Sequence, residues 1–230
     1  MVNGWVLAVV SFFAGSIPVG YLVGRAQGID VTQVGSGNIG ATNIGRVLGK
    51  KAGAFCLAMD ILKGLIPALV FRMIVDRPIF GFGFRSEDFG LICGGLAMLG
   101  HMYSPFLKFR GGKGIATGLG MLLGSAWPVG ISVLIGFGVA FALTRIVSLA
   151  SLVAVATLLA AGFYFTPPPL FWSVYALLAA VIVWKHRPNI ERLLKGEEKQ
   201  FAFGSQEKVD PVPGGDSPSD LDGGDNTSGK

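Results

Sequence analysis

The sequence has little that would support metal, redox or cofactor chemistry. It contains two cysteines and two histidines in 230 residues, and no group of Cys, His, Asp and Glu has the spacing of a metal site. Cys56 and Cys93 each lie inside an apolar run, where a buried free thiol is the usual outcome. Paired carboxylates that share acid and base roles are also missing from the basic loops. We therefore expect a site without metal or cofactor that works chiefly by binding anions.

Charged residues are scarce, at 14%, whereas hydrophobic residues reach 51%, a balance that soluble domains rarely show. Such a chain needs lipid as part of its solvent, and α-helices satisfy their own backbone within a bilayer. We expect an all-α, polytopic membrane protein with seven transmembrane helices. The apolar runs that approach the length of a membrane span are 5–23, 52–75, 89–107, 115–126, 129–143, 149–165 and 170–184.

Two residues between the fourth and fifth runs leave the local structure open. Trp127 and Pro128 form either a tight turn between two short helices or a kink within one long helix. The distribution of charge favours the turn. With seven spans, the basic loops 25–51, 108–113 and 144–148 and the segment after residue 184 share one side, whereas six spans would separate them.

Basic residues on one side of the membrane indicate the orientation. By the positive-inside rule, that side is cytoplasmic, so the N-terminus is outside and the C-terminus is inside. Residues 199–230 are rich in Asp, Gly, Ser and Pro and have too little apolar area to fold. We expect a membrane domain over 1–198, followed by a disordered acidic tail over 199–230.

The loop after the first run contains a glycine-rich motif. It reads G-S-G-N-I-G from Gly35, with Arg46 a short distance beyond. A dinucleotide fold would require a strand before this motif, and here a membrane helix precedes it. The glycines still allow successive N–H groups to form an anion nest, with Ser36 and Asn38 as neutral donors. The alternative is an ordinary turn whose polar side chains cap its own backbone.

A second glycine-rich loop follows the third run. Lys113 is flanked by Gly111, Gly112 and Gly114 and directly precedes the fourth run. The signature of a nucleotide phosphate loop is incomplete, but a lysine on bare backbone before a helix suits a single anion. The alternative is an interfacial lysine whose ammonium reaches the headgroups.

Three further positions are candidates with open alternatives. Lys63 follows Asp60 by three residues inside the second run, so it is either part of a structural ion pair or a wall of an anion pocket. Ser148 and Ser151 share one face at the start of the sixth run, which is also typical of a helix cap. His186 and Asn189 follow the last run in a basic segment that otherwise suits lipid headgroups.

These motifs together resemble a known family. G-S-G-N-x-G-A-T-N after the first run, G-H-M-Y-x-x-F-x-x-F-x-G-G-K-G after the third and K-H-R-x-N-I-x-R-L-x-x-G-x-E after the last are similar to the three cytoplasmic motifs of bacterial acyl-phosphate:glycerol-3-phosphate acyltransferases. The resemblance covers about residues 5–198. It implies a seven-helix membrane enzyme of the bacterial inner membrane that makes lysophosphatidic acid in the first step of phospholipid synthesis.

The resemblance also implies roles and partners. Ser36, Lys113, His186 and Asn189 become catalytic candidates. Acyl phosphate and glycerol 3-phosphate become the substrates, with membrane lipid and the soluble enzyme that makes acyl phosphate as partners, and no nucleic acid. The candidates for substrate binding are Gly35, Gly37, Asn38, Arg46, Lys63, Gly111, Gly112, Gly114, Ser148 and Ser151.

Two questions stay open at this point. The base that accepts the hydroxyl proton is either a phosphate oxygen of the donor or His186. The rival class of function is a transporter of phosphate or a phosphorylated solute, because broken membrane helices also bind anions. Against a transporter, the sequence shows no internal repeat, and its polar loops cluster on one face.

Overall fold

The computed structural model describes residues 4–74, 86–166 and 170–201. Within those ranges the regular elements are all helices, so the all-α expectation is confirmed there. Residues 202–230 lie outside the described part, and the expected disorder of the tail therefore stays a prediction. The elements are α1 (Gly4–Ser16), α2 (Val19–Arg25), α3 (Ala41–Val47), α4 (Lys50–Ile74), α5 (Ser86–Met102), η1 (Pro105–Leu107), α6 (Ile115–Ser125), α7 (Trp127–Thr144), α8 (Val147–Phe165), α9 (Leu170–Lys185) and α10 (Arg187–Leu194).

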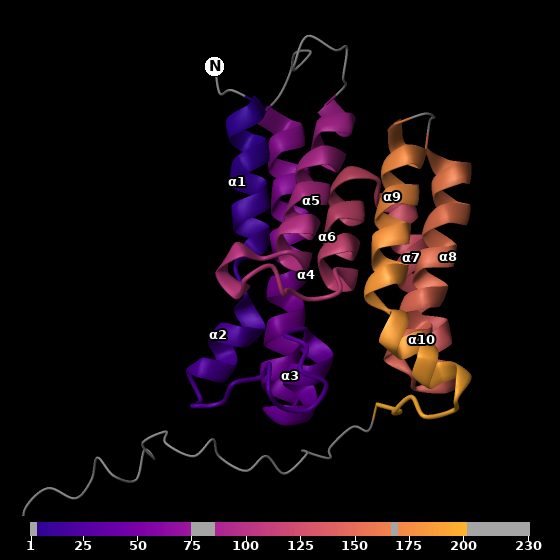
Figure 1. Ribbon diagram of the computed structural model, residues 1–230. Coiled ribbons are helices and arrows are strands. Elements are labelled where there is room, and N and C mark those ends of the chain that lie inside the picture. Colours follow the sequence, from indigo (N-terminus) through magenta and orange to yellow (C-terminus); the bar gives the residue numbers. More distant parts are fainter. Residues whose placement is uncertain (1–3, 75–85, 167–169, 202–230) are drawn as a thin grey trace, which may run out of the picture.

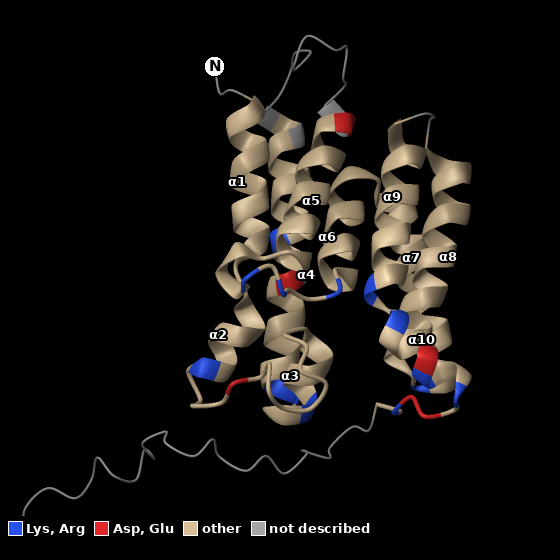
Figure 2. Ribbon diagram, viewed as in Figure 1, with Lys and Arg blue, Asp and Glu red and all other residues tan. Residues whose placement is uncertain are grey.

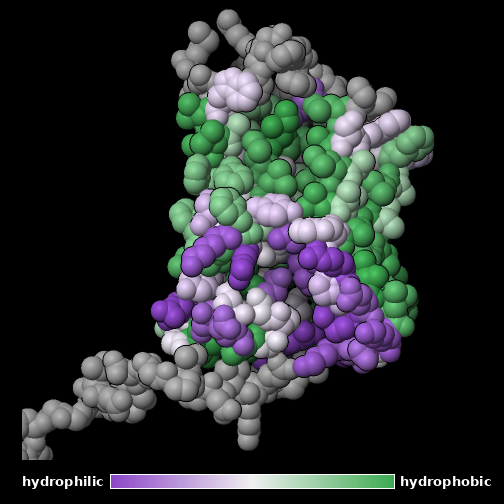
Figure 3. All heavy atoms as spheres, viewed as in Figure 1, coloured by the Kyte–Doolittle hydropathy of each residue, from purple (hydrophilic) through white to green (hydrophobic). Residues whose placement is uncertain are grey.

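Helices lie over every apolar run that the sequence indicated. The segments long and apolar enough to cross a membrane are Gly4–Arg25, Lys50–Phe71, Asp88–Leu107, Trp127–Thr144 and Val147–Phe165, and two shorter apolar helices are Ile115–Ser125 and Leu170–Lys185. Figure 3 shows hydrophobic side chains over the upper part of the molecule and hydrophilic ones gathered below. Helices of this length and hydropathy are typical of a protein that spans a membrane.

Two breaks in the helices follow from local sequence. Ala126 has φ −147° and ψ 68°, so α6 ends at Ser125 and α7 starts at Trp127 with Pro128 in its first turn. The tight turn is therefore confirmed in place of a kinked helix. The first run divides at Pro18 into α1 and α2, because proline has no N–H to continue the hydrogen-bond ladder.

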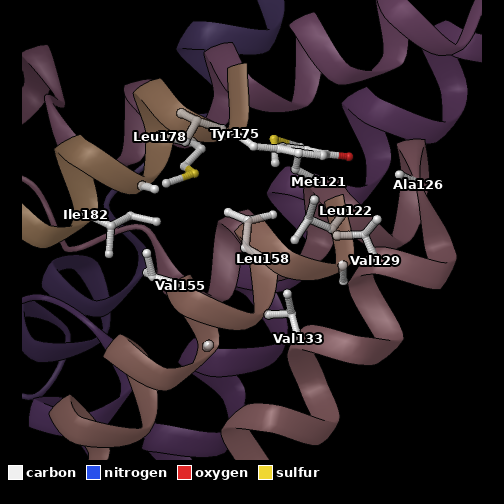
Figure 4. Close-up of a cluster of buried hydrophobic side chains, with 14 of the residues drawn as sticks. Met121, Leu122, Ala126, Val129, Val133, Val155, Leu158, Tyr175, Leu178 and Ile182 are labelled. Atoms are coloured by element: carbon white, nitrogen blue, oxygen red, sulfur yellow. The ribbon is translucent and has the colours of Figure 1, made fainter. Parts of the chain in front are cut away.

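The helices form two groups that meet at α6 (Figure 1). α1, α4, α5 and α6 pack together, while α7, α8 and α9 form the other group. Helices α4 and α6 approach closely, since a Cβ at Gly64 would overlap Thr117 and one at Gly120 would overlap the Ile61 carbonyl. A buried apolar cluster that includes Met121, Leu158 and Tyr175 joins the two groups (Figure 4).

The polar elements gather at one end of the bundle. Helices α2, α3 and α10 lie at the end opposite the N-terminus (Figure 1), and most described lysines and arginines lie on or near this end (Figure 2). The loop that carries Lys113 connects α5 to α6 and lies above α3, on the group formed by α1, α4, α5 and α6 (Figure 1). The fold thus brings the three sequence motifs to the same end of the molecule.

Candidate functional site

Lys113 is held at the start of α6 by a compact glycine loop. Gly111 N–H donates to the Met102 carbonyl at 3.2 Å and Gly112 N–H to the His101 carbonyl at 3.0 Å. Gly114 has φ +84°, a conformation that glycine adopts without the steric cost of a Cβ. The Lys113 Nζ then reaches across to α10, where it donates to Asn189 Oδ1 at 2.5 Å.

Asn189 links that ammonium to a carboxylate that the sequence reasoning did not select. Asn189 is buried in the first turn of α10, and its Nδ2 donates to Glu198 Oε1 at 2.5 Å. Ser148 Oγ donates to the same oxygen at 2.7 Å. Arg192 Nε donates to the second oxygen, Glu198 Oε2, at 2.6 Å. Glu198 therefore joins α8 and α10 around the lysine as a single carboxylate that accepts hydrogen bonds from both helices.

Burial and charge set the protonation of this cluster. Burial lowers the pKa of Lys113 to about 8; the Glu198 carboxylate opposes that shift, while Arg192 and Arg46 add to it. Burial also raises the pKa of Glu198, but hydrogen bonds from Ser148, Asn189 and Arg192 outweigh it and leave the pKa below its ordinary value. Lys113 is therefore a cation at neutral pH, and Glu198 is an anion.

His186 lies between α9 and α10 and is buried. Its Nδ1 is 2.8 Å from the Ile182 carbonyl, which assigns the proton to Nδ1 and leaves the Nε2 lone pair available. Burial lowers the pKa of His186 to about 4; the Ile182 carbonyl opposes the shift and the Lys113 charge adds to it. The imidazole is therefore neutral near pH 7.

The first glycine loop is a turn fixed by two asparagines. Ser36 N–H donates to Asn43 Oδ1 at 2.8 Å, and Gly40 N–H donates to Asn38 Oδ1 at 2.8 Å. Gly35 and Gly37 have φ +60° and +66°, which explains the glycines at these positions. The Asn38 oxygen is thus engaged within the turn, and Ser36 is exposed on its surface.

Arg46 on α3 faces the segment that follows α10. Its Nη2 donates to the Lys199 carbonyl at 3.5 Å, and its guanidinium lies 6.0 Å from the centre of the Phe201 ring. Phe201 N–H donates to the Arg145 carbonyl at 2.7 Å. The chain from Glu198 to Phe201 therefore runs from the Lys113 cluster to Arg46, and the Arg46 charge contributes to the lowered pKa of Lys113.

Lys63 and Ser151 hydrogen-bond outside this cluster. Lys63 Nζ lies 2.8 Å from Asp60 Oδ1 and 3.1 Å from the Ile17 carbonyl, which favours the structural ion pair over the pocket wall. Ser151 Oγ donates to the Val147 carbonyl at 2.8 Å within α8. Hydrogen bonds thus connect Lys113 to Asn189 and, through Glu198, Asn189 to Ser148, while Lys63 and Ser151 make theirs elsewhere.

An apolar pocket adjoins the polar cluster. It is partly open and is lined by residues of α5 to α9. At its polar end the lining includes Gly114, next to Lys113, and Ile182, whose carbonyl faces His186. At the other end it includes Val133 and Leu158, which Figure 4 shows pointing into the same apolar cluster. The site therefore combines cations, neutral donors and an apolar slot.

Metal binding finds no support in the part of the chain that the structure describes, where no group of three or more His, Cys, Asp and Glu could hold an ion.

Glu198 and Arg192 are the members of the cluster that the sequence did not single out. A signal for Glu198 was present, because it is the final residue of the third motif. Its role is hard to identify from sequence because it follows Glu197 and lies directly before the acidic tail. Arg192 belongs to the basic segment after the last apolar run, where several other basic residues surround it.

Comparisons with known proteins agree on one family. A family model described as glycerol-3-phosphate acyltransferase matches residues 5–196. A glycerol-3-phosphate acyltransferase of Anaeromyxobacter sp. strain Fw109-5 is 43% identical over 87% of this chain and 97% of its own length. One of Gloeobacter violaceus is 44% identical over 86% and 96%, respectively.

Solved structures of an integral membrane glycerol 3-phosphate acyltransferase, PlsY, are also similar. Its glycerol 3-phosphate form superposes with a TM-score of 0.78 at 36% identity, covering 86% of this chain and 96% of that chain. Its lysophosphatidic acid form superposes with a TM-score of 0.76 at 35% identity, covering 87% and 96%.

Proposed function

Because the chain belongs to the glycerol-3-phosphate acyltransferase family, we propose that it transfers a fatty acyl group from acyl phosphate to the 1-hydroxyl of glycerol 3-phosphate. The products are lysophosphatidic acid and inorganic phosphate. The chain is an acyltransferase of a membrane family; the donor, the position acylated and the place of the reaction as the first step of phospholipid synthesis are the proposal.

The observation that carries the proposal is the position of Lys113 between a polar cluster and an apolar pocket. Its ammonium contacts Asn189, and the next residue, Gly114, lines the pocket. A phosphate at the lysine and an acyl chain in the pocket would place the acyl carbonyl between them. An acyl phosphate has both parts, joined at the reacting carbon, which makes it a better fit than a donor with a bulky leaving group.

The chemistry needs positioning and charge stabilisation more than a covalent intermediate. The 1-hydroxyl oxygen attacks the acyl carbonyl carbon, the bond from that carbon to the phosphate oxygen breaks, and the hydroxyl proton passes to a phosphate oxygen. Cations at Lys113 and Arg46 stabilise the phosphate that leaves. The hydroxyl groups of Ser36, Ser148 and Ser151 are proposed to act as neutral donors that bind substrate oxygens.

The pKa of His186 bears on which group accepts the proton. With a pKa lowered to about 4 by burial, its imidazole is a weak acceptor near neutral pH. We therefore favour the phosphate oxygen as base, with His186 Nε2 accepting a hydrogen bond that orients the hydroxyl. The Lys113 ammonium donates a hydrogen bond to Asn189. We propose that the ammonium donates to the substrate phosphate instead when substrate binds.

The proposed setting is the cytoplasmic membrane of a bacterium. The five long and two shorter apolar helices support seven crossings, with the N-terminus outside and the basic end of the bundle in the cytoplasm. Glycerol 3-phosphate would then reach the site from the cytoplasm, and the soluble enzyme that makes acyl phosphate would deliver the donor from the same side. Residues 199–230 are proposed to form a cytoplasmic tail, whose first residues, Lys199 to Phe201, contact Arg46 and Arg145.

A direct assay tests the donor and the product together. Purified protein in detergent is incubated with glycerol 3-phosphate and palmitoyl phosphate, palmitoyl-CoA or palmitoyl-acyl carrier protein in separate reactions. We expect lysophosphatidic acid and an equal amount of inorganic phosphate with palmitoyl phosphate alone. Product formed from either thioester and not from palmitoyl phosphate would refute the proposed donor.

A further inference from the structure

A buried polar group beneath the Lys113 loop has no part in the proposed reaction. His101 is 4% exposed at the end of α5, and its Nδ1 makes no hydrogen bond among the described residues. That nitrogen lies 3.7 Å from Asp60 Oδ1, and Asp60 is itself 3% exposed. Burial of an imidazole and a carboxylate has an energetic cost, so their placement needs a reason.

The charge of Asp60 is compensated locally. Lys63 pairs with it at 2.8 Å and also donates to the Ile17 carbonyl at the break between α1 and α2. Asp60 is thereby fixed between three helices, and the carboxylate offers His101 a stationary neighbour. The ring of His101 consequently has a defined orientation at the base of the glycine loop.

The contact between His101 and the loop is with Gly112. Gly112 N–H donates to the His101 carbonyl at 3.0 Å, and a Cβ built on Gly112 would overlap the imidazole, whose Nε2, Cε1 and Cδ2 are its nearest neighbours. Gly112 does not have a positive φ, so its backbone conformation does not require glycine. The space taken by the His101 ring is the reason that residue 112 has no side chain.

We propose that His101, held beside Asp60, is a positioning residue that sets the location of the Lys113 ammonium by supporting the Gly112 backbone. The loop lies directly on the imidazole, and Lys113 is the next residue along the chain. The lysine must reach Asn189 at 2.5 Å, and a displacement of about 1 Å at a site of this kind is costly for catalysis. The inference rests on the proposed function of Lys113, but the contact that it names does not.

The decisive test is suppression of one defect by another. Gly112→Ala forces the loop away from the ring, and we expect kcat/KM to fall by about tenfold or more. Adding His101→Ala removes the obstructing ring, so the double variant should recover about threefold or more relative to Gly112→Ala alone. His101→Phe keeps a ring in place and should give no recovery. Leu91→Ala, which truncates another buried side chain of α5, should give none either.

A second measurement does not depend on activity. Hydrogen exchange of the peptide spanning residues 110–114 should be faster in His101→Ala than in the unaltered protein, because the Gly111 and Gly112 amides lose their support. Leu91→Ala should leave that peptide unchanged. If His101→Ala does not fold, the smaller polar side chain of His101→Asn replaces it in both experiments.

The outcomes separate the two hypotheses. Recovery of Gly112→Ala by Leu91→Ala or His101→Phe as well as by His101→Ala, or no recovery by His101→Ala, overturns the positioning role. Unchanged exchange at 110–114 in His101→Ala also overturns it. If the unaltered protein makes no lysophosphatidic acid, the proposed function fails, and hydrogen exchange still decides whether His101 supports the loop.

Discussion

Replacing Glu198 with glutamine tests whether one carboxylate holds the polar end of the site together. Glu198→Gln preserves the shape of the side chain, but only one of its two terminal atoms can still accept hydrogen bonds. Ser148 and Asn189 donate to Glu198 Oε1, and Arg192 donates to Oε2. In the variant, the amide nitrogen would face the Arg192 N–H, or else the two other donors.

The magnitude follows from those three contacts. A charged acceptor strengthens each hydrogen bond by about 1 kcal/mol over a neutral one, which applies to the bonds from Ser148 and Asn189. Arg192 is 43% exposed on its side chain, so its ion pair adds at most about 1 kcal/mol. We expect a loss of about 2 to 3 kcal/mol in unfolding free energy and a midpoint lower by about 4 to 12 °C.

Thermal unfolding in detergent, followed by intrinsic fluorescence, measures this loss. Glu197→Gln is the matched control, because Glu197 is the adjacent acidic residue and is exposed. The pKa of Glu198 is below its ordinary value, so its contribution is present at neutral pH and is lost as the pH falls below the ordinary glutamate range. Equal midpoints for the Glu198→Gln and Glu197→Gln variants at neutral pH would refute the reasoning.

The remaining predictions concern activity. Lys113→Ala and Arg46→Ala should each lower kcat/KM by about a hundredfold or more, since each removes a charge-assisted contact to phosphate worth about 2 to 4 kcal/mol. Lys195→Ala, at an exposed position, should leave kcat/KM nearly unchanged. An equal loss of kcat/KM in Lys113→Ala and Lys195→Ala would contradict the anion site. In the unaltered protein, kcat/KM should decline as the pH rises past about 8, where Lys113 loses its proton. Lys113→Arg should move that decline to higher pH because guanidinium keeps its charge. A pH profile that is the same for both proteins would show that another group titrates. His186→Gln should keep much of the rate if the donor phosphate is the base, and loss of most of the rate in that variant would instead identify His186 as the base.

The membrane helices could be predicted from the sequence because their signal is the length of an apolar run. The turn at Ala126 was also within reach, since Trp127 and Pro128 interrupt such a run and the charge distribution favoured two helices. The division of the first run at Pro18 was missed. Proline is tolerated in many membrane helices, and Pro67 lies inside the unbroken helix α4, so a proline in an apolar run does not by itself predict a break.

The site was predictable in its cations and less so in its anion. Lys113 and Asn189 were selected from their motifs, and the structure brings them together. Glu198 is hard to identify because composition describes a segment as a whole, and the segment after Gly196 is rich in acidic residues. Whether a carboxylate in such a segment is solvated or buried depends here on its contacts with Ser148 and Arg192. Ser148 is far away in sequence, and Arg192 is one of several basic residues in its segment.

The arrangement of helix ends explains why these motifs meet. Lys113 precedes the first turn of α6, Ser148 lies in the first turn of α8 and Asn189 in the first turn of α10. The N-terminal end of a helix carries partial positive charge, so the hydrogen bonds among these residues bring three positive ends to one place. Glu198 is stabilised there by hydrogen bonds from the side chains of Ser148, Asn189 and Arg192. A carboxylate supplied by the chain keeps Asn189 and Ser148 in position, and Lys113, on the side next to the apolar pocket, is left as the cation that a substrate phosphate meets.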